Sequence, residues 1–303
     1  MKLLITGGTG LIGRALISKL AENGHEMTVL SRQPAPGLPQ STAVLEWDAS
    51  TVGSWGRTLE SCDAVINLAG ESLGAGRWTK PQKEKIRTSR INATNALVHA
   101  IGKGTRKPKV FLHASAVGYY GHVDEGDVVE SHAPGSDFLA DVCIRWEEAA
   151  KAVLQHSVRL VVLRQGFVLA KGANAFKRMQ LPFKLFAGGP YGSGRQWFPW
   201  VHIEDVVGAY RFALEHSSLS GPVNVVAPNP VRVKELAREL GKAMRRPSFA
   251  PAPSIALRLV LGEMADLLLK GQRVLPRKLL EAGYAFKFPH LPDALKDVLN
   301  RWG

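Results

Sequence analysis

Hydrophobic positions in the first two thirds of the chain fall into short continuous runs that alternate with stretches of helical spacing. Between Lys2 and Arg164 these runs are KLLIT, MTVLS, AVLEW, AVINLA, KVFLHAS and RLVVLR. Continuous apolar runs, rather than alternating ones, are typical of parallel strands that helices cover on both faces. The pattern therefore predicts an α/β fold with a doubly wound parallel sheet.

The pattern changes after the segment GPVNVVAPNPV, where helical spacing continues without matching strands. The Pro-Asn-Pro at residues 228–230 indicates a connection rather than a strand. We predict a Rossmann-like domain over residues 1–221, which includes a loop segment at about residues 171–203 on the substrate side. Residues 222–303 are predicted to form a smaller, mainly helical cap.

The composition limits which binding partners and which compartment are expected. The net charge of +13 comes from basic residues spread along the chain without an arginine- and aromatic-rich module, so nucleic acid is not expected. Cys62 and Cys143 are far apart in sequence, which predicts neither a disulfide framework nor a metal site. Because no leader and no apolar run near the ~20 residues of a membrane span is present, we expect a cytoplasmic protein without a membrane partner.

A glycine-rich turn follows the first predicted strand, in KLLITGGTGLIGRALISKL. Glycine permits a tight turn and a close approach to a pyrophosphate, while the helix N-terminus offers free N–H groups and partial positive charge. Strand, turn and amphipathic helix occur in the order that this use requires. We therefore predict a dinucleotide at this turn, in contact with Gly7, Thr9, Gly10, Leu11, Ile12 and Gly13.

Ser31 and Arg32 decide which dinucleotide is expected. An NAD site places an acidic residue at the end of the second strand, whereas this chain reads VLSRQP there. A guanidinium suits a 2′-phosphate through charge-assisted hydrogen bonds, whereas a carboxylate would repel it. NADP(H) is therefore favoured as the cofactor, and the alternative is that Arg32 is only an exposed charge.

The glycine spacing and several later motifs resemble the extended short-chain dehydrogenase/reductases of the NAD(P)-dependent epimerase/dehydratase family. These motifs are NLAG, ASAVGYYG, GSGRQWFPWVHIEDVVGA and GQRVLPRKLLEAGYAFKFPHL. The resemblance covers essentially the whole chain and is closest to an atypical subgroup whose members are often named sugar-nucleotide epimerases or cell-division inhibitors. It implies an epimerase-type domain with a characteristic C-terminal domain, and it does not identify a substrate.

The resemblance also implies further cofactor contacts. Asp48 matches the acid that contacts adenine in this family, although a turn-forming aspartate is almost as good an explanation. Asn92 matches an asparagine that supports the active site, with a buried structural amide as the alternative. The other contacts are expected at Leu68, Ala69, Gly70, Arg90 and Val168.

Typical members of the superfamily use a tyrosine as the proton carrier and a lysine four residues later. In the segment SDFLADVCIRWEEAA, Phe138 or Leu139 stands in place of the tyrosine, and Val142 or Cys143 in place of the lysine. Asp137 instead begins a helix whose apolar residues have the spacing of a packed face. The standard proton relay is therefore absent.

A different proton source is needed if the chain is an enzyme, because the nicotinamide supplies only the hydride. Ser115 matches the family's serine, and Tyr119 and Tyr120 are the nearest candidate proton donors, with aromatic packing as their alternative role. We expect an NADP(H)-dependent oxidoreductase or epimerase that acts on a small molecule. The alternative is a catalytically inactive NADPH-binding sensor or regulatory protein, related to cell division in the subgroup's naming.

The segment GGPYGSGRQWFPWVHIEDV combines glycines with Arg195, Trp197, Phe198 and Trp200. It suits a loop that lines an apolar pocket with one anion contact, or equally one that seals two lobes together. His202 and Asp205 at the start of the next helix are expected to be mainly structural.

Overall fold

A seven-stranded sheet organises the molecule. In the computed structural model, which describes residues 1–300, the strand order is β11, β7, β5, β4, β1, β2, β3. All neighbouring pairs are parallel, as the continuous apolar runs predicted. The strands are β1 (Lys2–Thr6), β2 (Glu26–Ser31), β3 (Thr42–Glu46), β4 (Ala64–Asn67), β5 (Val110–Ala116), β7 (Arg159–Gln165) and β11 (Gly221–Val225).

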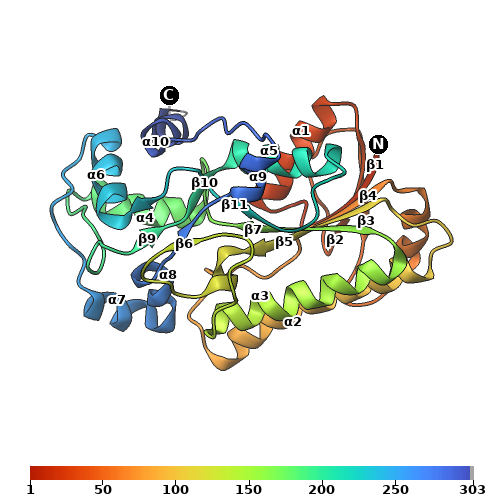
Figure 1. Ribbon diagram of the computed structural model, residues 1–303, viewed down its shortest axis with the longest axis horizontal. Helices are drawn as coiled ribbons and strands as arrows, with labels where there is room; N and C mark the ends of the chain where they lie inside the picture. Colours follow the sequence, from red (N-terminus) through yellow and green to blue (C-terminus); the bar gives the residue numbers. More distant parts are fainter. Residues whose placement is uncertain (301–303) are drawn as a thin grey trace.

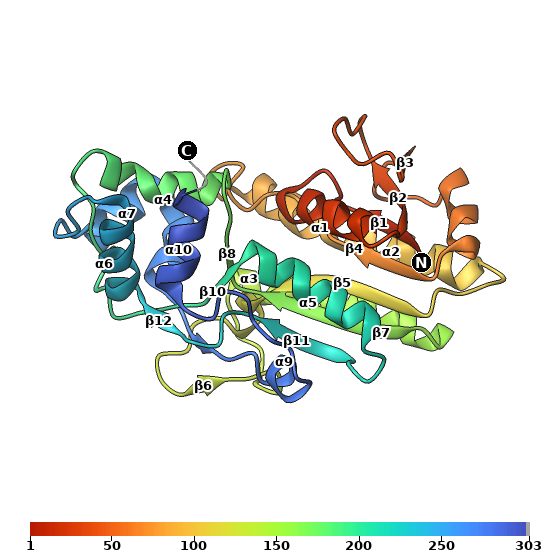
Figure 2. The same cartoon turned by 90° about the horizontal axis from the view of Figure 1, so that it is seen from above.

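Helices cover both faces of this sheet (Figures 1 and 2). One face packs against α1 (Leu11–Glu22) and α5 (Ile203–Glu215), and the other against α2 (Lys80–Lys103) and α3 (Phe138–Lys151). The short helical turns η1 (Ser54–Ser61) and η3 (Ala152–His156) complete the second face. The doubly wound fold is confirmed. Strand order reverses between β1 and β4, where such folds bind ligands at the carboxyl ends of their strands.

A smaller, mainly helical cap lies beside the sheet. Its core is shared by α4 (Asn174–Lys184), α6 (Val233–Met244) and α10 (Leu291–Asn300). Two short strand pairs frame it: β8 (Phe167–Leu169) with β10 (Trp200–His202), and β9 (Trp197–Phe198) with β12 (Val231–Arg232). At its outer end lie α7 (Ser254–Leu261), η4 (Gly262–Ala265) and α8 (Asp266–Leu269) (Figure 1).

The last part of the chain returns to the sheet. The strand β13 (Arg273–Val274) pairs with β6 (Asp127–Val128), which follows the turn η2 (Val117–Tyr120), and α9 (Arg277–Glu281) packs beside β11. The sheet ends at Val225 rather than before residue 222, and the middle segment 171–203 contributes α4 to the cap. The division into residues 1–221 and 222–303 stays a prediction, and residues 301–303 lie outside the described residues.

Candidate functional site

The turn between β1 and α1 is closely packed around its glycines. Gly7 has a φ of +67°, and a Cβ there would lie 2.5 Å from the carbonyl oxygen of Leu68. A Cβ on Gly13 would lie 2.4 Å from the carbonyl oxygen of Gly7. Gly10 begins α1 without a side-chain cap, so the first N–H groups of the helix can serve a ligand. The geometry fits the phosphate cradle that the sequence predicted.

The other predicted residues of this turn lie at its rim. Thr9 and Leu11 are exposed and Ile12 is half-buried. The carbonyl oxygen of Thr9 accepts a hydrogen bond from the Nε of Arg14 at 3.1 Å, and the same guanidinium donates to the carbonyl oxygen of Pro36 at 3.0 Å. Arg14 therefore connects the glycine turn to the loop after β2 through hydrogen bonds. This residue was not predicted from the sequence.

The loop after β2 carries the predicted 2′-phosphate contacts. Arg32 is exposed at the carboxyl end of the strand, and the Ser31 hydroxyl donates to the carbonyl oxygen of Gln33 at 2.7 Å. Because Arg14 holds Pro36, two guanidinium groups serve the same loop. The local charge is positive, as a 2′-phosphate requires.

Asp48 closes its own turn in the structure. Its carboxylate accepts hydrogen bonds from the backbone N–H groups of Ser50 and Thr51, both at 2.8 Å, and from the Thr51 hydroxyl at 2.6 Å. These hydrogen bonds lower the pKa of Asp48 well below its usual range. The turn-forming alternative thus accounts for this residue without a ligand, and adenine contact stays a prediction.

A buried polar cluster fixes the loop after β4. Asn67 Oδ1 accepts from the Thr6 hydroxyl at 2.7 Å and from the backbone N–H of Ala69 at 3.2 Å. Its Nδ2 donates to the Thr94 hydroxyl at 2.9 Å and lies 3.2 Å from Nδ1 of His113. Burial lowers the pKa of His113 to about 3, so the ring is neutral and its Nδ1 can accept. The turn Leu68–Gly70 is therefore rigid, as a surface that the cofactor passes closely must be.

Arg90 lies against this turn. A Cβ on Gly70 would lie 3.0 Å from the guanidinium carbon of Arg90. The guanidinium donates hydrogen bonds to the carbonyl oxygens of Glu71 and Ile86, each at 3.0 Å. The guanidinium stands 5.1 Å over the ring of Trp146, and burial lowers its pKa. Among the described residues the Glu71 carboxylate pairs with Lys85 at 3.5 Å, and no ion pair includes Arg90. The partly desolvated guanidinium of Arg90 is thus held by neutral groups beside the turn after β4.

Asn92 is not part of the buried polar cluster. It is exposed on α2, two residues beyond Arg90 and so on the opposite side of the helix. Thr94 takes the buried position instead, where its hydroxyl accepts from Asn67 and from the indole N–H of Trp146 at 3.0 Å. The role of Asn92 in supporting the active site stays a prediction, and Thr94 is the residue of this helix that joins the polar cluster. The helical period, which places Thr94 next to Arg90 on one face, was the signal available in the sequence.

Ser115 is buried, and its hydroxyl forms a hydrogen bond within the protein. Its hydroxyl donates to Oε1 of Glu147 at 2.6 Å, and Glu147 forms a buried ion pair with Arg164 at 2.8 Å. Burial alone would lower the pKa of Arg164, but the Glu147 carboxylate raises it. The ion pair links α3 to β7 behind the site. This geometry favours a structural role for Ser115, and its catalytic role stays a prediction.

The two tyrosines turn toward the β7 and β11 side of the sheet. The Tyr120 hydroxyl donates to Oδ1 of Asn224 at 2.6 Å and accepts from Arg164 at 3.0 Å. The residue is 1% exposed, and burial raises its pKa to about 12. The ring of Tyr119 stacks 3.4 Å from the guanidinium carbon of Arg164. The packing alternative therefore describes Tyr120 better than proton exchange, and Tyr119, which is half-buried, is the more accessible candidate.

The start of α3 carries no proton relay. Asp137 caps the helix by accepting from the backbone N–H of Ala140 at 2.9 Å, as expected. Phe138 packs edge-on against Trp78, with ring centroids 5.3 Å apart. Burial raises the pKa of the Cys143 thiol to about 12, and the neighbouring Arg90 only partly offsets this effect. The cation beside Cys143, one of the two candidates for the position of the family's lysine, is thus Arg90 of α2 rather than a residue of α3.

The aromatic segment before α5 mainly joins the two lobes. Phe198 and Trp200 are core residues of the cap, and Val168 pairs with Val201 between β8 and β10. Asp205 is 1% exposed and accepts the backbone N–H groups of Lys287 and Phe288 at 2.6 and 2.9 Å. His202 caps α5 by accepting from the backbone N–H of Glu204 at 3.2 Å. The sealing interpretation and the structural roles of His202 and Asp205 fit these contacts.

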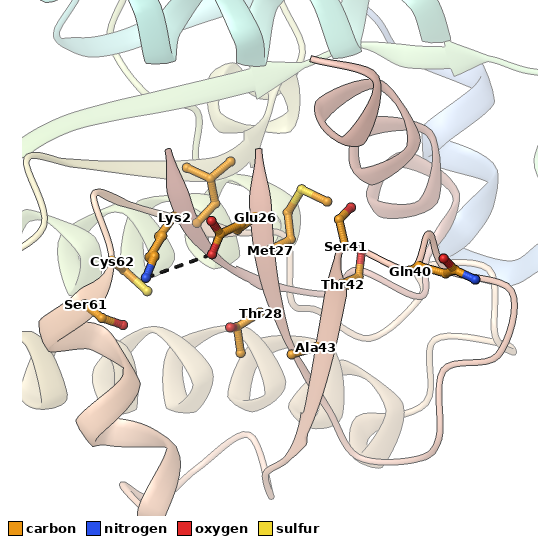
Figure 3. Close-up of a pocket in the computed structure, with 11 residues that line it drawn as sticks. Lys2, Glu26, Met27, Thr28, Gln40, Ser41, Thr42, Ala43, Ser61 and Cys62 are labelled. Carbon is orange, nitrogen blue, oxygen red and sulfur yellow. Dashed lines mark ion pairs between the residues drawn. The ribbon is translucent and has the colours of Figure 1, made fainter. Parts of the chain in front are cut away.

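Two cavities differ in their relation to this arrangement. The larger, about 390 Å³, opens at the amino ends of β1 and β2 and is lined by Lys2, Glu26, Thr42 and Cys62 among others (Figure 3). This is the opposite end of the strands from the glycine turn. A smaller cavity of about 200 Å³ lies beside the start of α1, against Leu11, Ile203 and Val298. Only the smaller cavity adjoins a predicted cofactor contact, and neither of the two contains Arg32 or Arg90.

Fold and glycine turn together define a dinucleotide-binding protein of the Rossmann class. A model of the NAD dependent epimerase/dehydratase family matches residues 3–226, and a domain of unknown function (DUF1731) matches residues 252–298. The chain belongs to the NAD dependent epimerase/dehydratase family, which confirms the resemblance. Within the described residues no helix is long and apolar enough to cross a membrane, and no group of three or more His, Cys, Asp or Glu could hold a metal ion.

Relatives match over the full length. The epimerase family protein SDR39U1 of Mus musculus is 41% identical over 303 residues, covering 99% of this chain and 100% of that protein. YfhF of Bacillus subtilis is 38% identical over 300 residues, covering 99% and 98%. The crystal structure of human SDR39U1 (isoform 2) with NADPH has a TM-score of 0.89 at 38% identity and covers 99% of both chains.

Proposed function

We propose that this protein binds NADP(H) in the crevice between the β1 and β4 strand ends. The observation that carries the proposal is the glycine turn, where added Cβ atoms on Gly7 and Gly13 would collide with backbone, beside a β2 end that carries Arg32 and no acid. The crystal structure of human SDR39U1 with NADPH supports it by similarity.

Each end of the cofactor has a defined set of contacts in this proposal. The pyrophosphate lies at the N-terminus of α1, where the dipole and free N–H groups favour it. The 2′-phosphate meets Arg32, in a loop that Arg14 holds in place. The nicotinamide end passes the rigid turn Leu68–Gly70 and reaches Arg90. A crystal structure with NADPH tests this placement, which fails if the phosphates lie away from Gly10 or the 2′-phosphate away from Arg32.

The proposed chemistry is an oxidoreductase or epimerase reaction on a small substrate. The bound cofactor supplies or accepts the hydride. Arg90 is a partly buried cation without a carboxylate partner among the described residues, which suits it to stabilise negative charge that develops on a substrate oxygen. Cys143 stays a neutral thiol. Tyr119 is the accessible hydroxyl nearest to the loop after β5 and is the proton donor that this proposal retains.

A second candidate function is an NADPH-binding regulator without turnover. The observation that favours it is the internal engagement of the Ser115 and Tyr120 hydroxyls, which bond to Glu147 and Asn224, together with the absent tyrosine and lysine on α3. Hydride loss from bound NADPH, followed by absorbance against a panel of small carbonyl compounds, separates the two functions. Turnover that Arg90→Lys preserves in part and Arg90→Met abolishes supports the enzyme, whereas no turnover with any carbonyl favours the regulator.

The proposal places the protein in the cytoplasm. Cys62 and Cys143 are both free thiols in the structure, which is the usual state in a reducing compartment. The substrate is proposed to be a small molecule, and nucleic acid is not a proposed partner.

A further inference from the structure

The outer end of the cap exposes an unusual amount of apolar surface. Seven large hydrophobic side chains there are more than half exposed, with Phe249 at 77%, Ile255 and Leu259 at 73% and Val260 at 69%. The helix α7 has no buried residue. Over the rest of the described chain, Leu154 at 55% is the one large apolar side chain with comparable exposure. Clustered exposure of this kind marks an interaction surface. The seven residues are Leu181, Leu185, Phe186, Phe249, Ile255, Leu259 and Val260.

These residues form one surface, which we call the cap face. The backbone N–H of Ala250 donates to the carbonyl oxygen of Gly188 at 3.0 Å, and that of Gly192 donates to Ala252 at 2.9 Å. The end of α4 therefore runs alongside the segment that leads into α7. The guanidinium carbon of Arg246 stands 4.5 Å over the ring of Phe186, which joins the two segments. Figures 1 and 2 show α6 and α7 at the end of the molecule away from β3.

The cap face carries a net positive charge. Residues 171–192 contain four basic residues and no acidic residue, and residues 239–263 contain four basic residues and two glutamates. Arg245 and Arg246 are exposed, and none of the ion pairs of the described residues includes either of them. Arg258 pairs with Asp266 at 3.1 Å, and Asp266 in turn pairs with Lys270 at 2.9 Å. The apolar side chains are therefore surrounded by net positive charge.

We propose, in contrast to the expectation from the sequence of no membrane partner, that the cap face docks this protein on an anionic membrane surface. Aliphatic and phenylalanine side chains beside lysine and arginine are the pattern of a segment that lies in the lipid interface, with apolar groups among the acyl chains and cations at the headgroups. The exposed side chains project from α4 and the turn after it, from Phe249 and from the short helix α7, and neither of the two cavities described above includes them. A partner peptide or helix would need a groove.

A second copy of the chain is a poorer occupant. In a two-fold contact the same patch meets itself, so Arg245 and Arg246 of both copies would be brought into one desolvated contact. Like charges gathered in such a contact oppose association. A membrane rich in anionic headgroups instead gains from every cation of the cap face, and the apolar side chains leave water at the same time.

Co-sedimentation of the full chain with lipid vesicles tests the proposal. The protein is expected to bind vesicles of phosphatidylcholine with phosphatidylglycerol, and to stay in solution with phosphatidylcholine alone. Phe249→Asp with Leu259→Asp should weaken binding at least tenfold, because two apolar contacts with the lipid are replaced by negative charges. Both side chains are exposed, so their replacement leaves the core intact. Leu154→Asp, at a similarly exposed apolar position far from the cap, is the matched control and should bind like the parent.

Charge makes an independent contribution. Arg245→Gln with Arg246→Gln should weaken vesicle binding by roughly 25-fold, at about fivefold for each cation near an anionic surface. Three results would overturn the proposal: no binding to anionic vesicles, equal loss in Leu154→Asp, or binding that ignores the Phe249 and Leu259 changes and so reflects only the overall charge. A parent that dimerises while Phe249→Asp is monomeric, or one that binds an acidic helical peptide but no vesicle, would also assign this surface to protein.

Discussion

Gly13 occupies a position in the nucleotide site where any side chain would collide with the backbone. A Cβ there would lie 2.4 Å from the carbonyl oxygen of Gly7, so Gly13→Ala must displace the turn that the pyrophosphate needs. We expect NADPH affinity to fall at least tenfold by fluorescence titration, with a stability cost of about 1–3 kcal/mol. Gly53→Ala is the control, because its Cβ would make only an ordinary contact at 3.5 Å. Equal NADPH affinity in parent and Gly13→Ala would place the cofactor elsewhere.

Tyr119 and Tyr120 form a matched pair for the question of the proton donor. Tyr120→Phe removes buried hydrogen bonds to Asn224 and Arg164, so urea unfolding should show a loss of about 1–3 kcal/mol. Tyr119→Phe keeps the ring on Arg164 and should change stability little. If the chain turns over a substrate, Tyr119→Phe should lower the rate by ~10²-fold while NADPH affinity is kept. A Tyr119→Phe enzyme with the parent's rate would remove Tyr119 as the proton donor.

Sequence position alone predicted some site residues and missed others. Arg32 was predictable because the end of β2 has a fixed relation to the ribose in this fold. Glu147 and Arg164 were not, since a buried ion pair between α3 and β7 depends on how the helix is set against the sheet. Tyr120 was predicted near the right loop, but its direction depends on Asn224, a residue of the distant strand β11.

The polar cluster beneath the site acts at the scale of whole elements. It joins β1, β4, β5, α2 and α3 through Asn67, Thr94, His113 and Trp146. The hydrogen bonds that the Thr94 hydroxyl accepts from Asn67 and Trp146 span 27 and 52 residues, which no local pattern reveals. Asn67 alone was visible, as a polar residue that ends the apolar run AVIN. Periodicity thus predicted the strands and helices, and the contacts between them required the structure.

His113 makes this cluster sensitive to acid. Its pKa falls from 6.5 to about 3 on burial, so the unfolded chain binds a proton below pH 6.5 that the folded protein does not. Stability should therefore fall as the pH falls from 6.5 toward 3, by at most about 1.4 kcal/mol per pH unit from this residue. Urea unfolding at pH 7 and pH 5 should show a drop that is smaller by roughly 2 kcal/mol in His113→Gln. His99→Gln, at an exposed position, should keep the parent's drop, and an unchanged drop in His113→Gln would contradict the assignment.

At the scale of the whole molecule, the cap and the sheet share residues from distant parts of the chain. The doubly wound sheet was predictable because its strands are continuous apolar runs. The contribution of α4 to the cap core was not, because segment 171–203 precedes the last sheet strand. Asp205, at the start of α5, accepts backbone N–H groups of Lys287 and Phe288 and so fastens the last third of the chain to the nucleotide half.

Cofactor preference tests the central claim most directly. Fluorescence titrations with NADPH and NADH should show tighter binding of NADPH to the parent, because Arg32, the proposed partner of the 2′-phosphate, follows β2 with no acid beside it. Arg32→Asp should reverse that order, by about 1.5–3 kcal/mol if one charged hydrogen-bonding partner is at stake. Equal affinities for the two nucleotides in the parent, or a preference for NADH, would contradict the account.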